Sequence, residues 1–197
     1  MVDYGIDKEK IFVVRPASTL KVNKEEIKDK KIRKSITFIK NFPSSKVAEI
    51  VLKIAKELPD FEFNIVGTVS KKIKNPPKNV KCYMNISWEE LKKILLSSSI
   101  YLHPMFFDPF PVSVLDAMRC GNFPLVYRLF GSSEILSKEN IFYSLDEKEI
   151  AEKVLKTYEN LSEKDFIKYH KHGMKFSEKR SSKEFRKVFN RILKKLH

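Results

Sequence analysis

The sequence predicts an α/β fold with a doubly wound, parallel sheet of about six strands flanked by helices. Runs of β-branched and aromatic residues of strand length alternate with segments whose apolar residues repeat at helical spacing. Proline, glycine and serine mark the boundaries between them. Strands that alternate with helices form βαβ units, and such units build parallel sheets. The 197 residues are enough for one domain with a substantial core.

The first half of the chain supplies three expected strands. Residues 35–41 form the first, and a helix is expected over 44–58, where apolar residues repeat at helical spacing after Pro43. Residues 61–69 and 80–86 form the second and third expected strands.

The second half continues the alternation. Ser87 is expected to cap a helix, because Glu90 follows it as in a capping box. Trp88 fits a packing residue at that helix start rather than a sugar platform, and His103 fits a packing residue at a strand end. The remaining expected elements are strands over 99–103, 123–127 and 141–143 and helices over 112–120, closed by Gly121, and 146–161. Ligands of such sheets bind outside the carboxyl ends of the strands.

The net charge of +14 indicates an anionic partner: nucleic acid, an anionic membrane surface or a phosphorylated ligand. The lysines are spread over helix faces and loops, as in Lys53/Lys56 and Lys194/Lys195. Nucleic-acid binding would rest on charge alone, since no RNA-binding signature or zinc spacing accompanies it, and it is not expected. A lysine-rich solvated surface and contact with an anionic membrane both stay open as explanations.

The sequence holds no apolar run long enough to cross a bilayer and no signal-peptide core. Cys82 and Cys120 lie far apart in apolar surroundings, which is typical of reduced core residues. We therefore expect a cytoplasmic protein, with peripheral membrane contact as the open alternative.

Residues 101–136 carry the strongest functional signal. A buried strand leads into a loop rich in proline and phenylalanine and then into a helix, whose free N–H groups form a ready anion site. Asp108 precedes this helix and fits a cap or turn residue when taken alone. Asp116 lies in its middle, either exposed and paired with Arg119 or buried and in need of a partner.

The segment resembles the signature of retaining GT-B glycosyltransferases of the group 1 family, which includes mannosyltransferases and glycogen synthases. That signature places two acidic residues eight positions apart around a Pro-Phe/Tyr-Gly turn and continues with Ala-Met-Ala-Cys-Gly. The matching runs here are Asp108-Pro109-Phe110-Pro111, Asp116-Ala117-Met118-Arg119-Cys120-Gly121 and Gly131-Ser132-Ser133-Glu134-Ile135. The resemblance implies the Rossmann-like C-terminal domain of such an enzyme, which binds a nucleoside-diphosphate-sugar donor.

The resemblance covers most of the chain and implies its division. Residues 1–34 hold a leading strand at 10–16 and a charged segment that is a mobile linker or a short helix. Residues 35–175 form the donor-binding domain, and residues 176–197 form a C-terminal helix. GT-B enzymes bind a sugar or lipid-linked acceptor in an N-terminal domain. We expect that domain outside this chain, as the other half of a longer protein in preference to a separate partner.

By resemblance, Asp116 accepts hydrogen bonds from the ribose hydroxyls, and Asp108 contacts the donor sugar or the reacting centre. Lys46 neutralises the leaving diphosphate, and the N–H groups of Val112 and Ser113 add helix-dipole stabilisation. Asp108 and Lys46 are thus the expected catalytic residues. The expected donor-binding residues are Asp116, Lys40, Asn41, Gly67, Asn85, Ile86, Phe110, Pro111, Val112 and Ser113. The family transfers with retention and generally without a bound metal, so no cofactor is expected.

Three departures from the family pattern favour an alternative function. Both acids are aspartates where the family usually has glutamate, so each carboxylate reaches one methylene less. Asn41 stands in place of an arginine, which removes a bidentate phosphate contact unless Lys40 or Arg128 replaces it. Pro111 stands where a glycine usually lets the backbone approach the sugar. The alternative is a non-catalytic module of the same fold that binds a partner or an anionic membrane surface.

Overall fold

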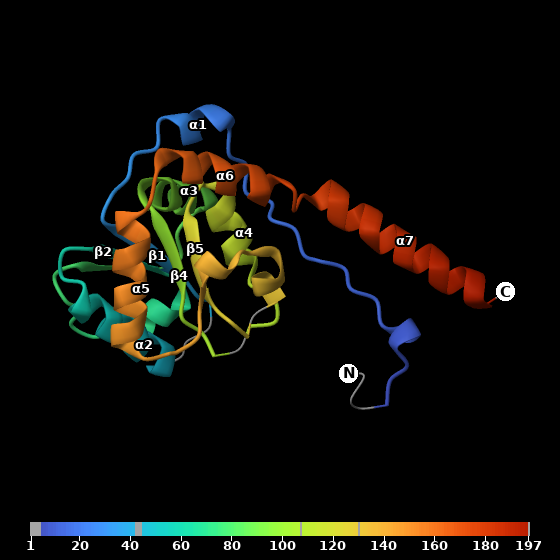
Figure 1. The fold of residues 1–197 in the computed structure, drawn as a ribbon, viewed down its shortest axis with the longest axis horizontal. Helices are drawn as coiled ribbons and strands as arrows, with labels where there is room; N and C mark the ends of the chain where they lie inside the picture. Colours follow the sequence, from blue (N-terminus) through green and yellow to red (C-terminus); the bar gives the residue numbers. More distant parts are fainter. Residues whose placement is uncertain (1–4, 42–44, 107, 130, 197) are drawn as a thin grey trace.

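The computed structural model describes residues 5–41, 45–106, 108–129 and 131–196 and confirms the expected α/β fold (Figure 1). Six strands form one sheet in the order β3-β2-β1-β4-β5-β6, and every neighbouring pair is parallel. The strands are β1 (Ser35–Ile39), β2 (Glu62–Val66), β3 (Val80–Tyr83), β4 (Ile100–His103), β5 (Phe123–Tyr127) and β6 (Ile141–Phe142).

Helices flank the sheet in two packed groups. The helices are α1 (Lys24–Lys28), α2 (Ser45–Glu57), α3 (Trp88–Ser97), α4 (Val112–Arg119), α5 (Glu147–Glu159), α6 (Glu163–Met174) and α7 (Glu178–Leu196). Helix α2 packs against α5, whereas α4 packs against α6, which also contacts α1. Short 3-10 helices occupy Lys8–Lys10, Thr68–Lys72, Gly131–Ile135 and Lys138–Asn140.

The central strands are buried along their whole length. Every residue of β1, β4 and β5 is buried, which is the pattern of parallel strands covered on both faces. Helix α2 turns Val47, Val51 and Ile54 toward the same core. These strands therefore show continuous apolar runs in the sequence instead of alternation.

Four expected strands end earlier than predicted: those expected over 35–41 and 141–143 stop at Ile39 and Phe142, and two others stop one or two residues before a residue with positive φ. The strand expected over 61–69 stops at Val66, because Gly67 has φ 103° and ψ −171° and the chain then turns into a 3-10 helix. The strand expected over 80–86 stops at Tyr83, and Asn85 follows with φ 56°. Both breaks lie at the carboxyl edge of the sheet.

The N-terminal expectations are only partly met. Residues 11–23 contain no helix or strand, so the leading strand expected at 10–16 is wrong for these described residues. The charged segment contains the short helix α1, closed at its start by a capping box of Asn23 and Glu26. Pro43 and Ser44, expected at the start of α2, lie outside the described residues.

Two buried cations fasten the N-terminal segment to the sheet domain. Arg119 Nη1 donates to the Leu20 carbonyl at 2.7 Å, and its Nη2 donates to the Phe176 carbonyl at 3.2 Å. Lys30 Nζ donates to the carbonyls of Leu95 and Cys120 at 3.0 and 2.7 Å. Burial lowers the pKa of Lys30 to about 7. These bonds hold residues 20–30 across the ends of α3 and α4.

The C-terminal helix α7 extends away from the rest of the domain, with the N-terminal segment running nearby (Figure 1). Ser181 Oγ donates to the Arg15 carbonyl at 3.1 Å, and the Arg191 guanidinium lies 5.3 Å from the centre of the Phe12 ring. Within the described part of the chain, no helix is long and apolar enough to span a membrane.

The two cysteines differ in their surroundings. Cys120 is buried at the end of α4, as expected, and burial raises the pKa of its thiol to about 12. Cys82 is exposed, so its expected core position is wrong. It lies on β3, one of the two edge strands of the sheet.

Gly67 is required for the turn that leaves β2, and its substitution tests this part of the fold. A Cβ at this position would collide with the Lys40 carbonyl and the Asn41 side chain, in a backbone conformation that L residues rarely adopt. We expect Gly67→Ala to lower the free energy of unfolding by about 1–3 kcal/mol in urea titrations.

Gly5→Ala is the matched control, because Gly5 also has positive φ but an added Cβ there meets nothing within 4 Å. A smaller loss is expected for it. Equal losses for the two variants would contradict the role given to the Lys40 and Asn41 contacts.

Candidate functional site

The site lies where the strand order of the sheet reverses. From β1 the sheet continues through β2 to β3 on one side and through β4 to β6 on the other. Connections that leave in opposite directions open a crevice at the carboxyl ends of the two central strands. Here those ends are Ile39 and His103, the last residues of β1 and β4. The loops that follow them carry most of the predicted site residues.

A charged cavity of about 340 Å³ occupies this crevice. The loop after β1 contributes Lys40 and Asn41 to it. The segment from β4 into α4 contributes His103, Asp108, Phe110, Pro111, Val112, Ser113 and Asp116. Eight of the predicted residues therefore meet here, although more than sixty positions separate the two loops.

Asp108 is held by two partners from the ends of the two central strands. Its Oδ2 lies 3.2 Å from Lys40 Nζ and 3.4 Å from His103 Nε2. Burial raises the pKa of Asp108, but the hydrogen bond and charge of His103, together with Lys40, outweigh burial and bring that pKa below its ordinary value. The carboxylate is thus kept ionised inside the cavity.

The sequence suggested that His103 only packs at a strand end, but its ring nitrogens also contact polar groups of the site. Its Nδ1 lies 3.1 Å from the Tyr101 hydroxyl, which donates to Ser113 Oγ at 2.7 Å. Burial lowers the pKa of His103, Asp108 raises it, and Lys40 lowers it. A continuous chain of polar groups therefore links the first turn of α4 to Asp108. The sequence signal was the Tyr-x-His spacing on a buried strand, which places both rings on one face.

Asp116 is buried, with 6 % of its surface exposed. The alternative of an exposed carboxylate paired with Arg119 is therefore wrong, because both side chains are buried and Arg119 bonds to backbone carbonyls. Burial raises the pKa of Asp116, while a hydrogen bond from Ser18 and the charge of Arg119 oppose that rise. Asp116 lines the cavity beneath the first turns of α4.

The first turn of α4 faces the cavity without a side-chain cap. Pro111 is its N-cap residue, and it supplies no capping hydrogen bond. N–H groups at such a helix start keep free hydrogen-bonding capacity and a partial positive charge. The loop before it is fixed by Gly131, whose N–H donates to the Pro109 carbonyl at 2.9 Å. A Cβ on Gly131 would collide with that carbonyl, so the close approach requires glycine.

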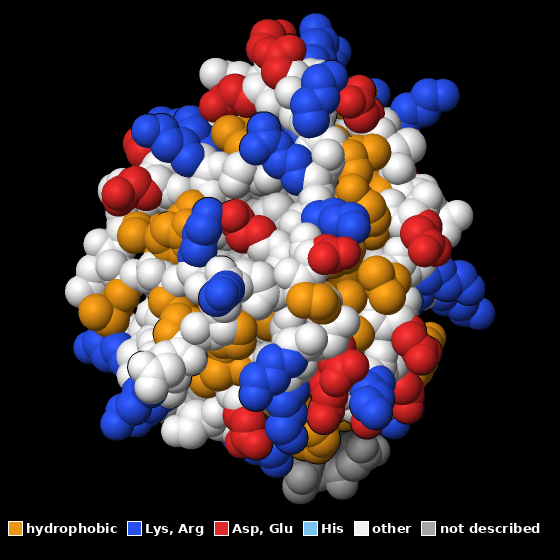
Figure 2. Space-filling model, turned by 90° about the vertical axis from the view of Figure 1, so that its left-hand side faces the viewer, with side chains coloured by type: hydrophobic (Ala, Val, Ile, Leu, Met, Phe, Trp, Pro, Cys, Tyr) orange, Lys and Arg blue, Asp and Glu red, His pale blue; other side chains and the backbone are white. Residues whose placement is uncertain are grey.

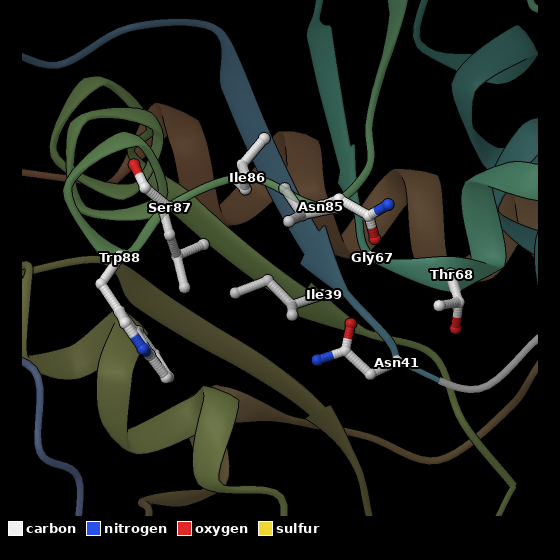
Figure 3. A pocket seen from close by; sticks show the side chains of 10 residues that line it. Ile39, Asn41, Gly67, Thr68, Asn85, Ile86, Ser87 and Trp88 are labelled. Carbon is white, nitrogen blue, oxygen red and sulfur yellow. The ribbon is translucent and has the colours of Figure 1, made fainter.

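A second cavity of about 270 Å³ adjoins the charged one and shares four lining residues with it (Figure 3). Its lining consists of Ile39, Asn41, Val66, Gly67, Thr68, Asn85, Ile86, Ser87, Trp88 and Leu91. None of these side chains carries a charge, in contrast to the first cavity. In Figure 3, Asn85 to Trp88 follow one rim, with Asn41 and Thr68 on the other side and Ile39 between them.

Trp88 corrects another sequence expectation. It is the first residue of α3, and 62 % of its surface is exposed, so it does not pack into the core. It lines both cavities. The sequence placed Trp88 next to a cap but gave no sign of the neighbouring crevice, because that crevice is completed by β1.

The structure brings together all predicted site residues except Lys46. Lys46 lies exposed in the first turn of α2, outside the lining of both cavities, and residues 42–44 before it are outside the described part of the chain. Arg128 is also exposed and lines neither cavity. Lys40 therefore supplies the ammonium group that reaches the crevice.

Among the described residues, no group of three or more His, Cys, Asp or Glu side chains is arranged to hold a metal ion. The expectation of metal-free binding stays a prediction.

The protein family described as Glycosyl transferases group 1 matches residues 21–173. The chain belongs to this family. The matched range covers the whole sheet and both cavities, and it runs from just before α1 into the last turn of α6. No curated protein matches the sequence.

Solved structures share the fold at low identity. A glycosyltransferase from Rickettsia africae is 16 % identical with a TM-score of 0.77, over 97 % of this chain and 59 % of that chain. A mutant of S. aureus TarM, in complex with Fondaparinux, alpha-GlcNAc-glycerol and UDP, is 16 % identical with a TM-score of 0.75, over 96 % of this chain and 41 % of that chain.

The pneumococcal O-GlcNAc transferase GtfA, in complex with UDP and GlcNAc, is 16 % identical with a TM-score of 0.68, over 92 % of this chain and 39 % of that chain. The present chain thus corresponds to less than two thirds of each of these proteins. What they share with it is the Rossmann-like architecture of GT-B glycosyltransferases.

The contacts of His103 give opposite expectations for two substitutions, measured by NMR titration of its imidazole. Asp108→Asn removes the group that raises the pKa of His103, so that pKa falls further below its ordinary value. Lys40→Met removes a charge that lowers it, so the pKa rises. Shifts in the same direction, or none, would contradict the geometry around Asp108.

The lowered pKa of His103 also determines how the stability of the fold changes with pH. Because the folded-state pKa of His103 lies below its unfolded value, the unfolded chain takes up a proton first as the pH falls. His103 therefore lowers stability as the pH drops from about 6.5 to its folded pKa. A His103→Phe variant should lose this part of the pH dependence in urea titrations.

Proposed function

We propose that this chain is the donor-binding domain of a retaining glycosyltransferase and that its crevice binds a nucleoside-diphosphate sugar. The observation that carries the proposal is the pairing of a neutral cavity with a charged one at the reversal of the strand order. A nucleoside-diphosphate sugar has the same division, with a neutral base at one end and a diphosphate further along. UDP in the TarM and GtfA complexes supports this ligand class.

The diphosphate fits the charged cavity at the start of α4. The uncapped N–H groups of Val112 and Ser113 offer hydrogen bonds to an anion, and Lys40 adds a positive charge from the opposite loop. In this arrangement Lys40 supplies the phosphate contact that Asn41, in place of an arginine, does not. Lys46 stays a predicted catalytic residue whose contribution is tested by Lys46→Ala.

The two carboxylates take different roles. Asp116, under the first turns of α4, accepts hydrogen bonds from the ribose hydroxyls. Asp108 is kept ionised by Lys40 and His103, so it faces the donor sugar as an anion. Positive character that develops on the sugar during transfer is stabilised by such a carboxylate. We propose Asp108 as a catalytic residue beside the predicted Lys46.

The acceptor is a sugar or a lipid-linked sugar held by an N-terminal domain that faces the same edge of the sheet. The present chain spans 59 % of the Rickettsia africae enzyme and 41 % of TarM, which leaves room for such a domain in a protein of that length. On this proposal the enzyme acts in glycan or glycolipid synthesis.

Isothermal titration calorimetry with UDP, GDP and ADP tests the donor site. We expect at least one of them to bind, and Asp116→Ala to weaken it by about 1.5–3 kcal/mol because a charge-assisted hydrogen bond is lost. Asp60→Ala is the control, since Asp60 is exposed and lines neither cavity. No heat with any of the three at millimolar concentration would contradict the proposal.

A second candidate is a non-catalytic module that binds an anionic membrane, and helix α7 favours it. Phe185, Phe189, Ile192 and Leu193 are exposed at the spacing of one helix face. The basic side chains Lys179, Lys183, Arg186 and Lys187 lie together on another part of the helix. Helices with this division lie in membrane interfaces.

Vesicle flotation tests this candidate directly. It expects the chain to float with phosphatidylserine vesicles and not with phosphatidylcholine vesicles, and Phe185→Ser with Phe189→Ser to abolish flotation. The chain staying at the bottom of both gradients would exclude the candidate and leave the donor site untouched.

One face of the molecule gives no support to nucleic-acid binding. On the face drawn in Figure 2, Lys and Arg side chains are interspersed with Asp and Glu instead of gathering in one patch. A mixed surface of this kind does not form the continuous basic track that nucleic-acid binding requires.

A further inference from the structure

We propose that the indole of Trp88 is the stacking platform for the nucleobase of the donor. The inference rests on the proposed function and assigns a residue to it. It gives a role to an aromatic side chain that the sequence pattern treated as packing.

The position of Trp88 is fixed although its ring is free. Ser87 caps α3 in a complete capping box: Glu90 N–H donates to Ser87 Oγ at 3.2 Å, and Ser87 N–H donates to Glu90 Oε2 at 2.8 Å. These bonds hold the backbone of Trp88 at the rim of the crevice. Among the described residues, no hydrogen bond or ring contact holds the indole itself, and 62 % of Trp88 is exposed.

The cavity beside Trp88 has the chemistry that a nucleobase needs. Its uncharged lining combines the apolar side chains of Ile39 and Ile86 with the polar groups of Asn41 and Thr68 (Figure 3). Flat rings pack against apolar and aromatic surfaces, while amides and hydroxyls pair with the polar edge of a base. Base stacking on an aromatic side chain is sequence-tolerant and strong enough to affect affinity about tenfold.

The placement of Trp88 also orients the ligand. Trp88 lines both cavities, so a base against its ring leaves the ribose and diphosphate directed toward Asp116, Lys40 and the start of α4. The opposite orientation would put the diphosphate into a cavity without a cationic side chain. The indole therefore lies at the junction between the two parts of the ligand.

Trp88 is the only tryptophan of the sequence, so its own fluorescence reports on the site. We expect UDP or ADP to quench the emission of the full chain with the same affinity that calorimetry measures. Inorganic pyrophosphate is the matched probe, because it has the charges but no base, and should leave the emission nearly unchanged while it binds.

Substitutions of Trp88 test whether its ring stacks on the nucleobase or only lies near the bound ligand. We expect Trp88→Ala to weaken nucleoside diphosphate binding about tenfold in calorimetry, Trp88→Phe to restore most of it, and neither to change pyrophosphate binding. Tyr143→Ala is the control, since Tyr143 is a similarly exposed aromatic residue that lines neither cavity. Thermal unfolding of each variant confirms that the fold persists.

The outcomes distinguish this inference from the proposed function. If a nucleoside diphosphate binds the native chain but Trp88→Ala binds it equally well, without quenching in the native protein, the stacking role is wrong and the donor site stands. If neither nucleoside diphosphates nor pyrophosphate bind, the proposed function itself fails. Weakening of pyrophosphate and UDP alike by Trp88→Ala would mean that the residue supports the fold of the site and not the base.

Discussion

The parallel pairing of β1 with β4 is the constraint on which the rest of the structure depends. Ile36 and Thr37 pair with Ile100 and Tyr101, so two segments more than sixty residues apart end at the same edge. Chain connections leave these strands in opposite directions, and this divergence opens the crevice between their carboxyl ends. The shared edge of the two cavities and the contact between Lys40 and Asp108 follow from this register.

The charges of the site are arranged so that an anion can bind without leaving a buried polar group unpaired. Asp108 is already satisfied by Lys40 and His103, and the uncapped start of α4 stays open. Burial of Asp116 costs free energy that the Ser18 hydrogen bond and the Arg119 charge partly offset. Because Arg119 also fastens the N-terminal segment and the turn after α6, the fold and the site share one buried cation.

The sequence predicted the strands and the two aspartates because those signals are local. Helical spacing, the Ser87–Glu90 cap and the eight-residue offset of Asp108 and Asp116 can all be read within short windows. The bond between Asp108 and Lys40 could not be, since it depends on the register of β1 against β4. Trp88 was misread for the same reason, because its exposure depends on an opening that distant residues form. The expected strand at 10–16 failed because strand-like composition does not supply a pairing partner.

The central claim is that one nucleoside diphosphate occupies both cavities at the reversal point. The most direct measurement is a crystal structure of this chain grown with a saturating nucleoside diphosphate. We expect density for the base between Trp88 and Ile39, and for the diphosphate between Lys40 and the first turn of α4. A bound nucleotide elsewhere on the protein, with both cavities empty, would contradict it.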